Sequence, residues 1–409
     1  MFNIRAIALP SYFFVVLLFS SLSSRGLIST YTCYLVITTV VIAFCFLQRF
    51  WRIKTLNWHF DLFEYLLLLF FVVVFISGLL GLDPKKSIIH LAGLMIIYFF
   101  IKQQISCANQ LTINAMNKYL FIVCSLFVLA TILMIIFFPA FILNSSVYVN
   151  SPHWLLGLSG APNPNAGILF TLLILCLINF WSGFNRHFYL PLLLTPIIMA
   201  LLIASNSRSC LFSSLFLLIP LLSIYITYLV NKKTANKFLL AGIFIACSVI
   251  LLTVSYYVSF LPHFHNLIMR WGGQMTSLGG RTDIWQKSIT LLIHQYNPFT
   301  GVGLGNQYIL LHQCGYQYDK AHSSYVSAFL ETGIIGLFFY SLVILSNLWL
   351  ILRRFLNGYS FFQLFLLLAM ISLLLQASVE SYLNEQLSTH YFLYIFLYFL
   401  SKKYSTKQF

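Results

Sequence analysis

The sequence predicts an all-α integral membrane protein, built as a polytopic bundle of about 12 transmembrane helices. Two observations lead to this fold class. The chain of 409 residues is 60% hydrophobic and only 8% charged, whereas a soluble domain of this length would carry roughly a quarter charged residues. Its apolar stretches also recur at about the 20 residues that one membrane span requires. Residues 1–409 are therefore predicted to form a single integral membrane domain.

Polar breaks divide the chain into successive apolar stretches, with ten to twelve spans expected. The first stretch, after MFNIR, is predicted to remain an uncleaved span, because SSLSSRG lacks an A-x-A cleavage site. The eight cysteines contain no C-x-x-C pair, so no structural disulfide is expected. The predicted spans are residues 7–23, 27–47, 62–82, 87–100, 119–138, 167–184, 188–204, 211–230, 238–261, 333–352, 361–376 and 389–401.

The basic residues predict the orientation of the chain. With both termini placed in the cytoplasm, 15 of the 23 Lys and Arg residues fall in inner segments and 8 in outer ones. This excess satisfies the positive-inside rule. The net charge of +15 is thus explained mainly by topology, and no nucleic-acid partner is expected.

Two outer segments are long enough to build a site, residues 139–166 and residues 262–321. The longer one contains RTDIWQKSITLLIHQ, which predicts an amphipathic helix lying at the membrane surface. The glycine-rich stretch NPFTGVGLGN, residues 297–306, is expected to form a tight loop against that surface. The apolar face of the predicted helix comprises Ile284, Trp285, Ile289, Leu292 and Ile293.

Three arginines at the outer face are candidates for binding an anion. Arg208, in IASNSRSCLF, lies between two apolar runs, where an arginine costs roughly 2.5–3.5 kcal/mol on insertion scales. Arg281 follows two glycines that allow a ligand close to the backbone, and it opens a predicted helix whose N-terminus favours an anion. Arg270, in IMRWGG, is a weaker, supporting candidate. The alternatives without a function are that Arg208 is a snorkelling arginine at the membrane interface and that Arg281 is an ordinary surface arginine.

His322 is the candidate general base. An imidazole ordinarily titrates near neutrality and suits the activation of a hydroxyl nucleophile. It lies just before the apolar run that is predicted to begin near Gly333, on the same predicted face as the arginines. Glu380 is a supporting candidate that would orient this base or pair with an arginine, whereas Glu331 has no predicted role beyond a polar contact. A single histidine is more often structural, so its neighbours carry the argument.

Two arginines and one base, without a metal-ligand cluster or paired carboxylates, suggest transfer from a diphosphate. Arginines bind a diphosphate bidentately and stabilise the charge that develops as it leaves. Because a diphosphate is a good leaving group, neither a metal nor a cofactor is expected. The base would deprotonate a sugar hydroxyl that attacks the anomeric carbon.

Several motifs resemble the O-antigen ligase and O-antigen polymerase superfamily of bacterial envelopes. They are APNPNAG, which opens a span and contains the supporting candidate Asn165, then ASNSRS, and then GGRTDIW followed by NPFTGVGLGN. The last is AHSSYVSAFLETGIIGLFFY, with the ligase spacing H-x10-G from His322 to Gly333. The resemblance covers roughly residues 160–345, and the first 140 residues match only in hydropathy.

The resemblance implies a GT-C-like helical bundle in the bacterial inner membrane, with its active site facing the periplasm. The donor would be an undecaprenyl-diphosphate-linked glycan held by Arg208 and Arg281, and His322 would activate the acceptor. A ligase, the favoured alternative, transfers the glycan to lipid A-core, whereas a polymerase transfers it to a second lipid-linked glycan. Phe212 stands where many ligases have leucine, and the arginine-x15-glycine pattern of some polymerases is absent.

A transporter of lipid-linked sugars is the alternative from another class. Transporters place polar residues near the bilayer midplane between repeated halves. Here the polar candidates gather at the outer ends of the predicted spans, and no internal repeat is found. This distribution favours an enzyme that works at the outer surface.

Overall fold

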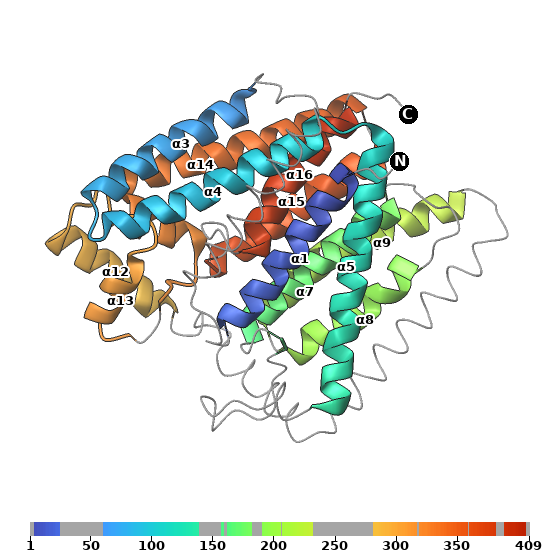
Figure 1. Cartoon of the computed structure of the whole chain (residues 1–409), viewed down its shortest axis with the longest axis horizontal. Coiled ribbons are helices and arrows are strands. Elements are labelled where there is room, and N and C mark those ends of the chain that lie inside the picture. Colours follow the sequence, from blue (N-terminus) through green and yellow to red (C-terminus); the bar gives the residue numbers. More distant parts are fainter. Residues whose placement is uncertain are drawn as a thin grey trace. The chain divides into compact units, whose positions relative to one another are not determined.

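The only regular secondary structure in the described part of the computed structural model is helical (Figure 1). The described residues are 4–24, 60–138, 157–158, 162–181, 190–205, 207–231, 281–316, 319–358, 360–381 and 388–405. No strand occurs in these residues, which confirms the all-α prediction for them. The helices are α1 (Ile4–Ser24), α3 (Leu62–Leu80), α4 (Pro84–Ser106), α5 (Gln110–Phe137), α7 (Pro162–Trp181), α8 (Leu190–Ala204), α9 (Arg208–Asn231), α12 (Arg281–Gln295), α13 (Gln307–Gln313), α14 (Ser324–Gly358), α15 (Phe361–Val379) and α16 (Thr389–Ser405).

Six of the described helices are long and apolar enough to cross a membrane, so the chain is a multi-pass membrane protein. These six candidate spans are Leu62–Leu80, Pro84–Ser106, Gln110–Phe137, Asn163–Phe180, Ser324–Asn357 and Phe361–Val379. Ten of the 12 predicted spans coincide with helices. The other two, residues 27–47 and 238–261, lie outside the described residues, so the count of 12 stays a prediction.

The helices belong to two compact units. The first unit contains α3, α4, α12, α13, α14, α15, α16 and α1 as far as Val16. The second contains the rest of α1, α5 from Asn114 onward, α7, α8 and α9. His322, Arg281 and Glu380 all lie in the first unit, whereas Arg208 and Asn165 lie in the second.

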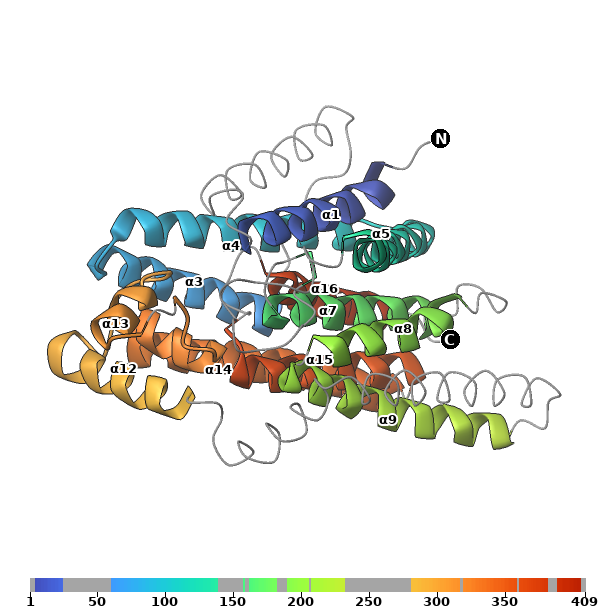
Figure 2. The same cartoon turned by 90° about the horizontal axis from the view of Figure 1, so that it is seen from below.

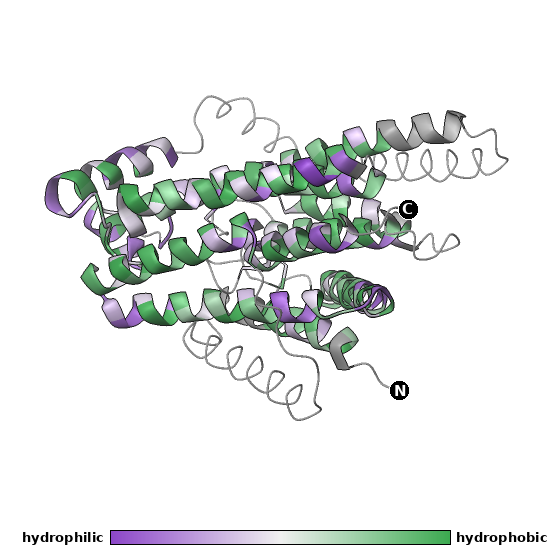
Figure 3. Ribbon diagram, turned by 90° about the horizontal axis from the view of Figure 1, so that it is seen from above, coloured by the Kyte–Doolittle hydropathy of each residue, from purple (hydrophilic) through white to green (hydrophobic). Residues whose placement is uncertain are grey.

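Five long helices of the first unit, α3, α4, α14, α15 and α16, pack on one another. Their side chains are mostly hydrophobic, whereas α12 carries many hydrophilic residues (Figure 3). α12 and α13 lie beside one end of this group (Figure 2), which we call the capped end. The loop between α3 and α4, the start of α14 and the end of α15 meet there.

At the opposite end of the first unit, ion pairs join four helices, and the pair between Glu64 and Lys102 is buried. Glu64 of α3 is fully buried and pairs with Lys102 of α4 at 2.5 Å and with Lys402 of α16 at 2.8 Å. Lys402 also lies 3.0 Å from Asp61, and Arg354 of α14 lies 3.7 Å from Asp61. These pairs fix the ends of α3, α4, α14 and α16 against one another.

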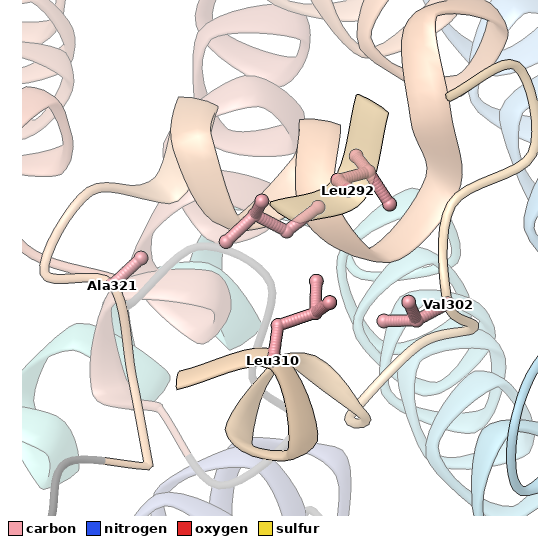
Figure 4. Close-up of a cluster of buried hydrophobic side chains, with 5 residues drawn as sticks. Leu292, Val302, Leu310 and Ala321 are labelled. Atoms are coloured by element: carbon pink, nitrogen blue, oxygen red, sulfur yellow. The ribbon is translucent and has the colours of Figure 1, made fainter. Parts of the chain in front are cut away.

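The predicted amphipathic helix is present as α12, but its apolar face packs on protein. Ile284 and Leu292 are buried, Trp285 and Ile289 are half-buried, and Ile293 is 50% exposed. Leu292 packs in a small core beneath the helix, where the side chains point toward one another (Figure 4). The sequence pattern did not distinguish this protein core from a lipid surface. The other members of this core are Val302, Leu310, Ala321 and Leu330.

α14 begins earlier than the sequence predicted and is broken in its interior. The span expected to begin near Gly333 begins at Ser324, directly after the His322 segment, because Ser323 accepts a hydrogen bond from Val326 N and caps the helix. Gly333 has φ 67° and ψ −168°, which interrupts the helical backbone. His322 is therefore separated from this break by more than two turns of helix.

The glycine loop, residues 297–306, seals this break. Val302 N and Gly303 N donate to the carbonyls of Leu330 and Glu331, and Ile334 N donates to Pro298 O. A Cβ on Gly333 would lie 2.3 Å from the carbonyl atoms of Phe299, so only glycine permits this approach. The loop therefore packs against α14, and the contact with the membrane surface that the sequence predicts stays a prediction.

The second unit corrects the boundary of the shorter outer loop. Residues 162–166, predicted to belong to loop 139–166, form the first turn of α7. Asn165 in this turn is fully buried and donates from Nδ2 to Ser205 Oγ of the α8–α9 connection at 3.4 Å. The APNPNAG motif thus anchors the start of α7 beside the connection that leads into Arg208.

Candidate active site

His322 has a backbone conformation that no other described non-glycine residue adopts. Its φ of 54° lies in the left-handed region, which is uncommon for side chains with a Cβ. Ser323 N donates to Ser381 Oγ at 2.9 Å on the C-terminal side of His322. On its N-terminal side, Trp285 Nε1 donates to Ala321 O at 2.6 Å. The folded chain therefore holds the backbone of His322 from both sides.

Glu380 is the direct partner of His322. Its Oε2 lies 3.4 Å from His322 Nδ1, and its side chain is only 3% exposed. Its backbone carbonyl accepts a hydrogen bond from Ser324 Oγ at 2.9 Å, which joins the end of α15 to the start of α14. Catalytic hydrogen bonds are often long before substrate binds, so 3.4 Å is compatible with a carboxylate that orients the imidazole.

Arg281 binds the other oxygen of the same carboxylate. Its Nη2 donates to Glu380 Oε1 at 2.7 Å. Glu380 therefore bridges Arg281, the first residue of α12, and His322, which lies two residues before the start of α14. The Arg281 side chain is 20% exposed, and a guanidinium carries five N–H donors in a fixed fork.

The exposed side of α12 carries a second, weaker set of charges. Asp283 accepts a hydrogen bond from Tyr316, and Lys287 Nζ lies 3.0 Å from its Oδ2. The hydrogen bond from Tyr316 is the main cause that lowers the pKa of Asp283 below its usual value, followed by that from Lys287. Asp283 is therefore ionised at neutral pH, and this contact ties α12 to the loop that follows α13.

Two further candidates lie in the second unit, and a third lies outside the described residues. Arg208 is the first residue of α9 and is exposed, directly after the buried Ser207. Asn165 is buried against the turn at Gly157 and beside Ser205, so its described contacts are structural. Arg270 and the glycines before Arg281 lie outside the described residues. The structure thus brings together His322, Arg281 and Glu380.

Sequence reasoning missed the residues that hold the His322 segment. Gln307, Trp285 and Ser381 each bind its backbone, and each stands far from His322 along the chain. The adjacency of Ser381 to Glu380 was the one available signal. Glu331, which had no assigned role, is 2% exposed and accepts from Gly305 N and Gln307 Nε2 at 3.0 and 2.9 Å.

A comparison with protein families supports the resemblance to the O-antigen ligase and polymerase superfamily. The model of a family described as O-antigen ligase matches residues 192–341, more than a third of the chain. This part of the chain is similar to the O-antigen ligase family. No curated protein matches the sequence.

The O-antigen ligase match covers Arg208, Arg281 and His322, whereas Glu380 and Asn165 lie beyond it. The family includes O-antigen ligases and O-antigen polymerases. Proteins of this family are glycosyltransferase-type enzymes of O-antigen processing that act on lipid-linked glycans.

Within the described residues, no three His, Cys, Asp or Glu side chains are grouped so that they would hold a metal ion together. Metal independence stays a prediction, which a chelator tests directly.

Proposed function

We propose that this protein is an O-antigen ligase that transfers a glycan from undecaprenyl diphosphate to lipid A-core at the periplasmic face. The observation that carries the proposal is the arrangement of His322, Glu380 and Arg281 at the capped end of the first unit. It places one ionisable base, one buried carboxylate and one arginine together in a chain that is similar to the O-antigen ligase family.

In the proposed reaction, His322 is the general base. Nδ1 faces Glu380, so Nε2 takes the proton from the acceptor hydroxyl. The hydroxyl oxygen forms a bond to the anomeric carbon of the donor glycan, and the bond from that carbon to the diphosphate oxygen breaks. The electron pair leaves on undecaprenyl diphosphate. The buried carboxylate of Glu380 stabilises the imidazolium formed in this step, as in other base–carboxylate pairs.

Arg281 and Arg208 are proposed to bind the diphosphate and stabilise the charge that develops on it. One Arg281 nitrogen binds Glu380, and the fork geometry of the guanidinium presents further donors to phosphate oxygens. Arg281 would thereby link the leaving group to the residue that orients the base. Arg208 enters the proposal through its exposed position at the start of α9 and its place in the family match.

The orientation is part of the proposal. Lys102, Arg354 and Lys402 lie at the end of the first unit opposite His322, and the positive-inside rule places such residues in the cytoplasm. The capped end would then face the periplasm, where both lipid-linked substrates are presented.

Deletion of the gene tests ligase against polymerase. A ligase is expected to leave lipid A-core without any attached glycan, while lipid-linked polymer accumulates. If the deletion instead leaves single repeat units attached to the core, the protein is a polymerase, and the acceptor in this proposal is wrong.

Treatment of the purified enzyme with a strong chelator tests metal independence. Transfer is expected to continue at the parent rate. Loss of transfer that a divalent ion restores would contradict the proposed mechanism.

A further inference from the structure

We infer that Gln307 and Glu331 are positioning residues that set the backbone of His322, an inference that rests on the proposed general-base function. Neither residue touches His322. They act through the backbone of Ala321, the residue directly before it.

Gln307 is the direct contact to this segment. It is the first residue of α13 and is 6% exposed. Its Oε1 accepts hydrogen bonds from Ala321 N at 3.0 Å and from Ser327 Oγ at 2.9 Å. One amide oxygen therefore joins the residue before His322 to the first turn of α14.

Glu331 determines which way the Gln307 amide points. Its Oε1 accepts from Gln307 Nε2 at 2.9 Å. The same oxygen accepts from Gly305 N, which can only donate, so it acts as an acceptor; the Gln307 amide nitrogen therefore faces it and the amide oxygen faces Ala321. The backbone N–H of Ala321 only donates, and therefore requires the same orientation.

The same carboxylate connects this chain of contacts to the glycine loop. Glu331 Oε1 also accepts from Gly305 N at 3.0 Å, and Glu331 O accepts from Gly303 N at 2.8 Å. Glu331 lies two residues before the break at Gly333. The sealed break thus holds Glu331, Glu331 orients Gln307, and Gln307 holds the segment that carries His322.

A second anchor shows how narrowly this segment is fixed. Ser381 Oγ accepts from Ser323 N and lies 2.9 Å from Ser327 Oγ, which in turn binds Gln307. Both neighbours of His322 are therefore tied to one buried polar network. Such support is what a left-handed residue with a Cβ requires, because the conformation is costly unless its surroundings impose it.

The test measures glycan transfer by purified Gln307→Ala, with Gln363→Ala as the matched control. Gln363 is also a buried glutamine, but it binds Ser401 O at the opposite end of the unit. Gln307→Ala is expected to lower kcat by about 10- to 100-fold at an unchanged KM for the lipid-linked donor, because a small misplacement of a catalytic group has effects of this size. Gln363→Ala is expected to keep the parent kcat. Equal kcat values for both variants would overturn the inference.

A double substitution separates this inference from the proposed function. If Gln307 acts through His322, adding Gln307→Ala to His322→Ala lowers the residual rate no further, since coupled residues are not additive. A further loss in the double variant would overturn the positioning role. Undiminished transfer by His322→Ala alone would instead contradict the general-base function on which the inference rests.

Glu331→Gln and Glu331→Ala test the role of the carboxylate without relying on one unstable variant. The glutamine oxygen accepts from both N–H groups, so Glu331→Gln is expected to retain kcat within about threefold. Glu331→Ala leaves both N–H groups without this acceptor and is expected to match Gln307→Ala. If Glu331→Gln were as slow as Glu331→Ala, the negative charge itself would be required and the orienting role would be wrong.

Discussion

At the scale of single residues, the left-handed backbone of His322 places its imidazole beside Glu380. Residues with a Cβ are destabilised in this region by roughly 1–2 kcal/mol, and the fold holds this one in place through hydrogen bonds to Ala321 and Ser323. The result is a short segment that sets His322 Nδ1 against Glu380. A helical residue at this position would point elsewhere.

Replacing His322 by glycine and by alanine separates the backbone effect from the chemistry. His322→Gly is expected to be more stable than His322→Ala by about 1 kcal/mol, because glycine adopts positive φ without a steric cost. Both variants are expected to lose transfer. Thermal unfolding in detergent measures the difference, and a higher midpoint for the alanine variant would contradict the strained backbone.

Glu380→Gln tests the bridging carboxylate. The substitution keeps the shape of the side chain but removes the negative charge shared by His322 and Arg281. We expect kcat to fall by about 10-fold or more, since the imidazolium formed during transfer loses its counter-charge. Steady-state kinetics on the reconstituted enzyme measure this, and a parent-like kcat would show that Glu380 does not assist the base.

At the scale of elements, the glycine loop pairs the backbone groups that the break in α14 leaves open. The glycine loop gives its N–H groups to the carbonyls before the break and accepts from the N–H group after it, so buried backbone groups remain paired. α3 also contacts α14 beside this break, because Ser77 Oγ donates to Glu331 O at 2.8 Å. The spacing H-x10-G therefore places His322 at the start of a helix whose break is fixed by Gly333.

Gly333→Ala tests the packing of the loop at this break, with Gly315→Ala as its control. Both glycines have positive φ, but a Cβ on Gly315 meets nothing within 4 Å, whereas one on Gly333 would lie 2.3 Å from Phe299 backbone atoms. Gly315→Ala is expected to cost only the backbone strain of about 1–2 kcal/mol. Gly333→Ala is expected to lower the unfolding midpoint much further and to reduce transfer. Equal midpoints would contradict the close approach of the loop.

The ion pairs at the opposite end of the first unit make a separate prediction. Glu64→Ala is expected to destabilise the protein by about 3–5 kcal/mol, because it leaves Lys102, 2% exposed, without its counter-charge. Lys287→Ala, which removes an exposed ion pair, is expected to leave the unfolding midpoint unchanged. Thermal unfolding of both variants checks the contrast, and similar midpoints would show that burial does not decide the effect.

At the scale of the whole molecule, the sequence predicted what depends on local composition. Apolar runs predicted the spans, and the helical spacing of the apolar residues in RTDIWQKSITLLIHQ predicted α12. The prediction from the sequence was wrong where tertiary contacts set the start of a helix. Helix α14 extends back to Ser324 because Ser323 caps it and Ala328 and Leu330 are buried. No local pattern shows that Arg281 and His322 share Glu380, because these residues meet only when α12, α14 and α15 are packed together.

The proposed topology follows from the two ends of the first unit. Lys287→Cys and Arg353→Cys place exposed thiols near the capped end and near the opposite end. In a Cys314→Ser background, a membrane-impermeant thiol reagent applied from the periplasm is expected to label the Lys287→Cys variant alone. Labelling of the Arg353→Cys variant alone would reverse the proposed orientation.

The most direct test of the central claim is single-turnover glycan transfer by purified His322→Ala, with lipid-linked donor and acceptor both saturating. We predict a rate about 10²- to 10⁴-fold below the parent, the usual contribution of a general base, while donor binding and the unfolding midpoint stay close to the parent values. A parent-like rate of transfer by this variant would contradict the account.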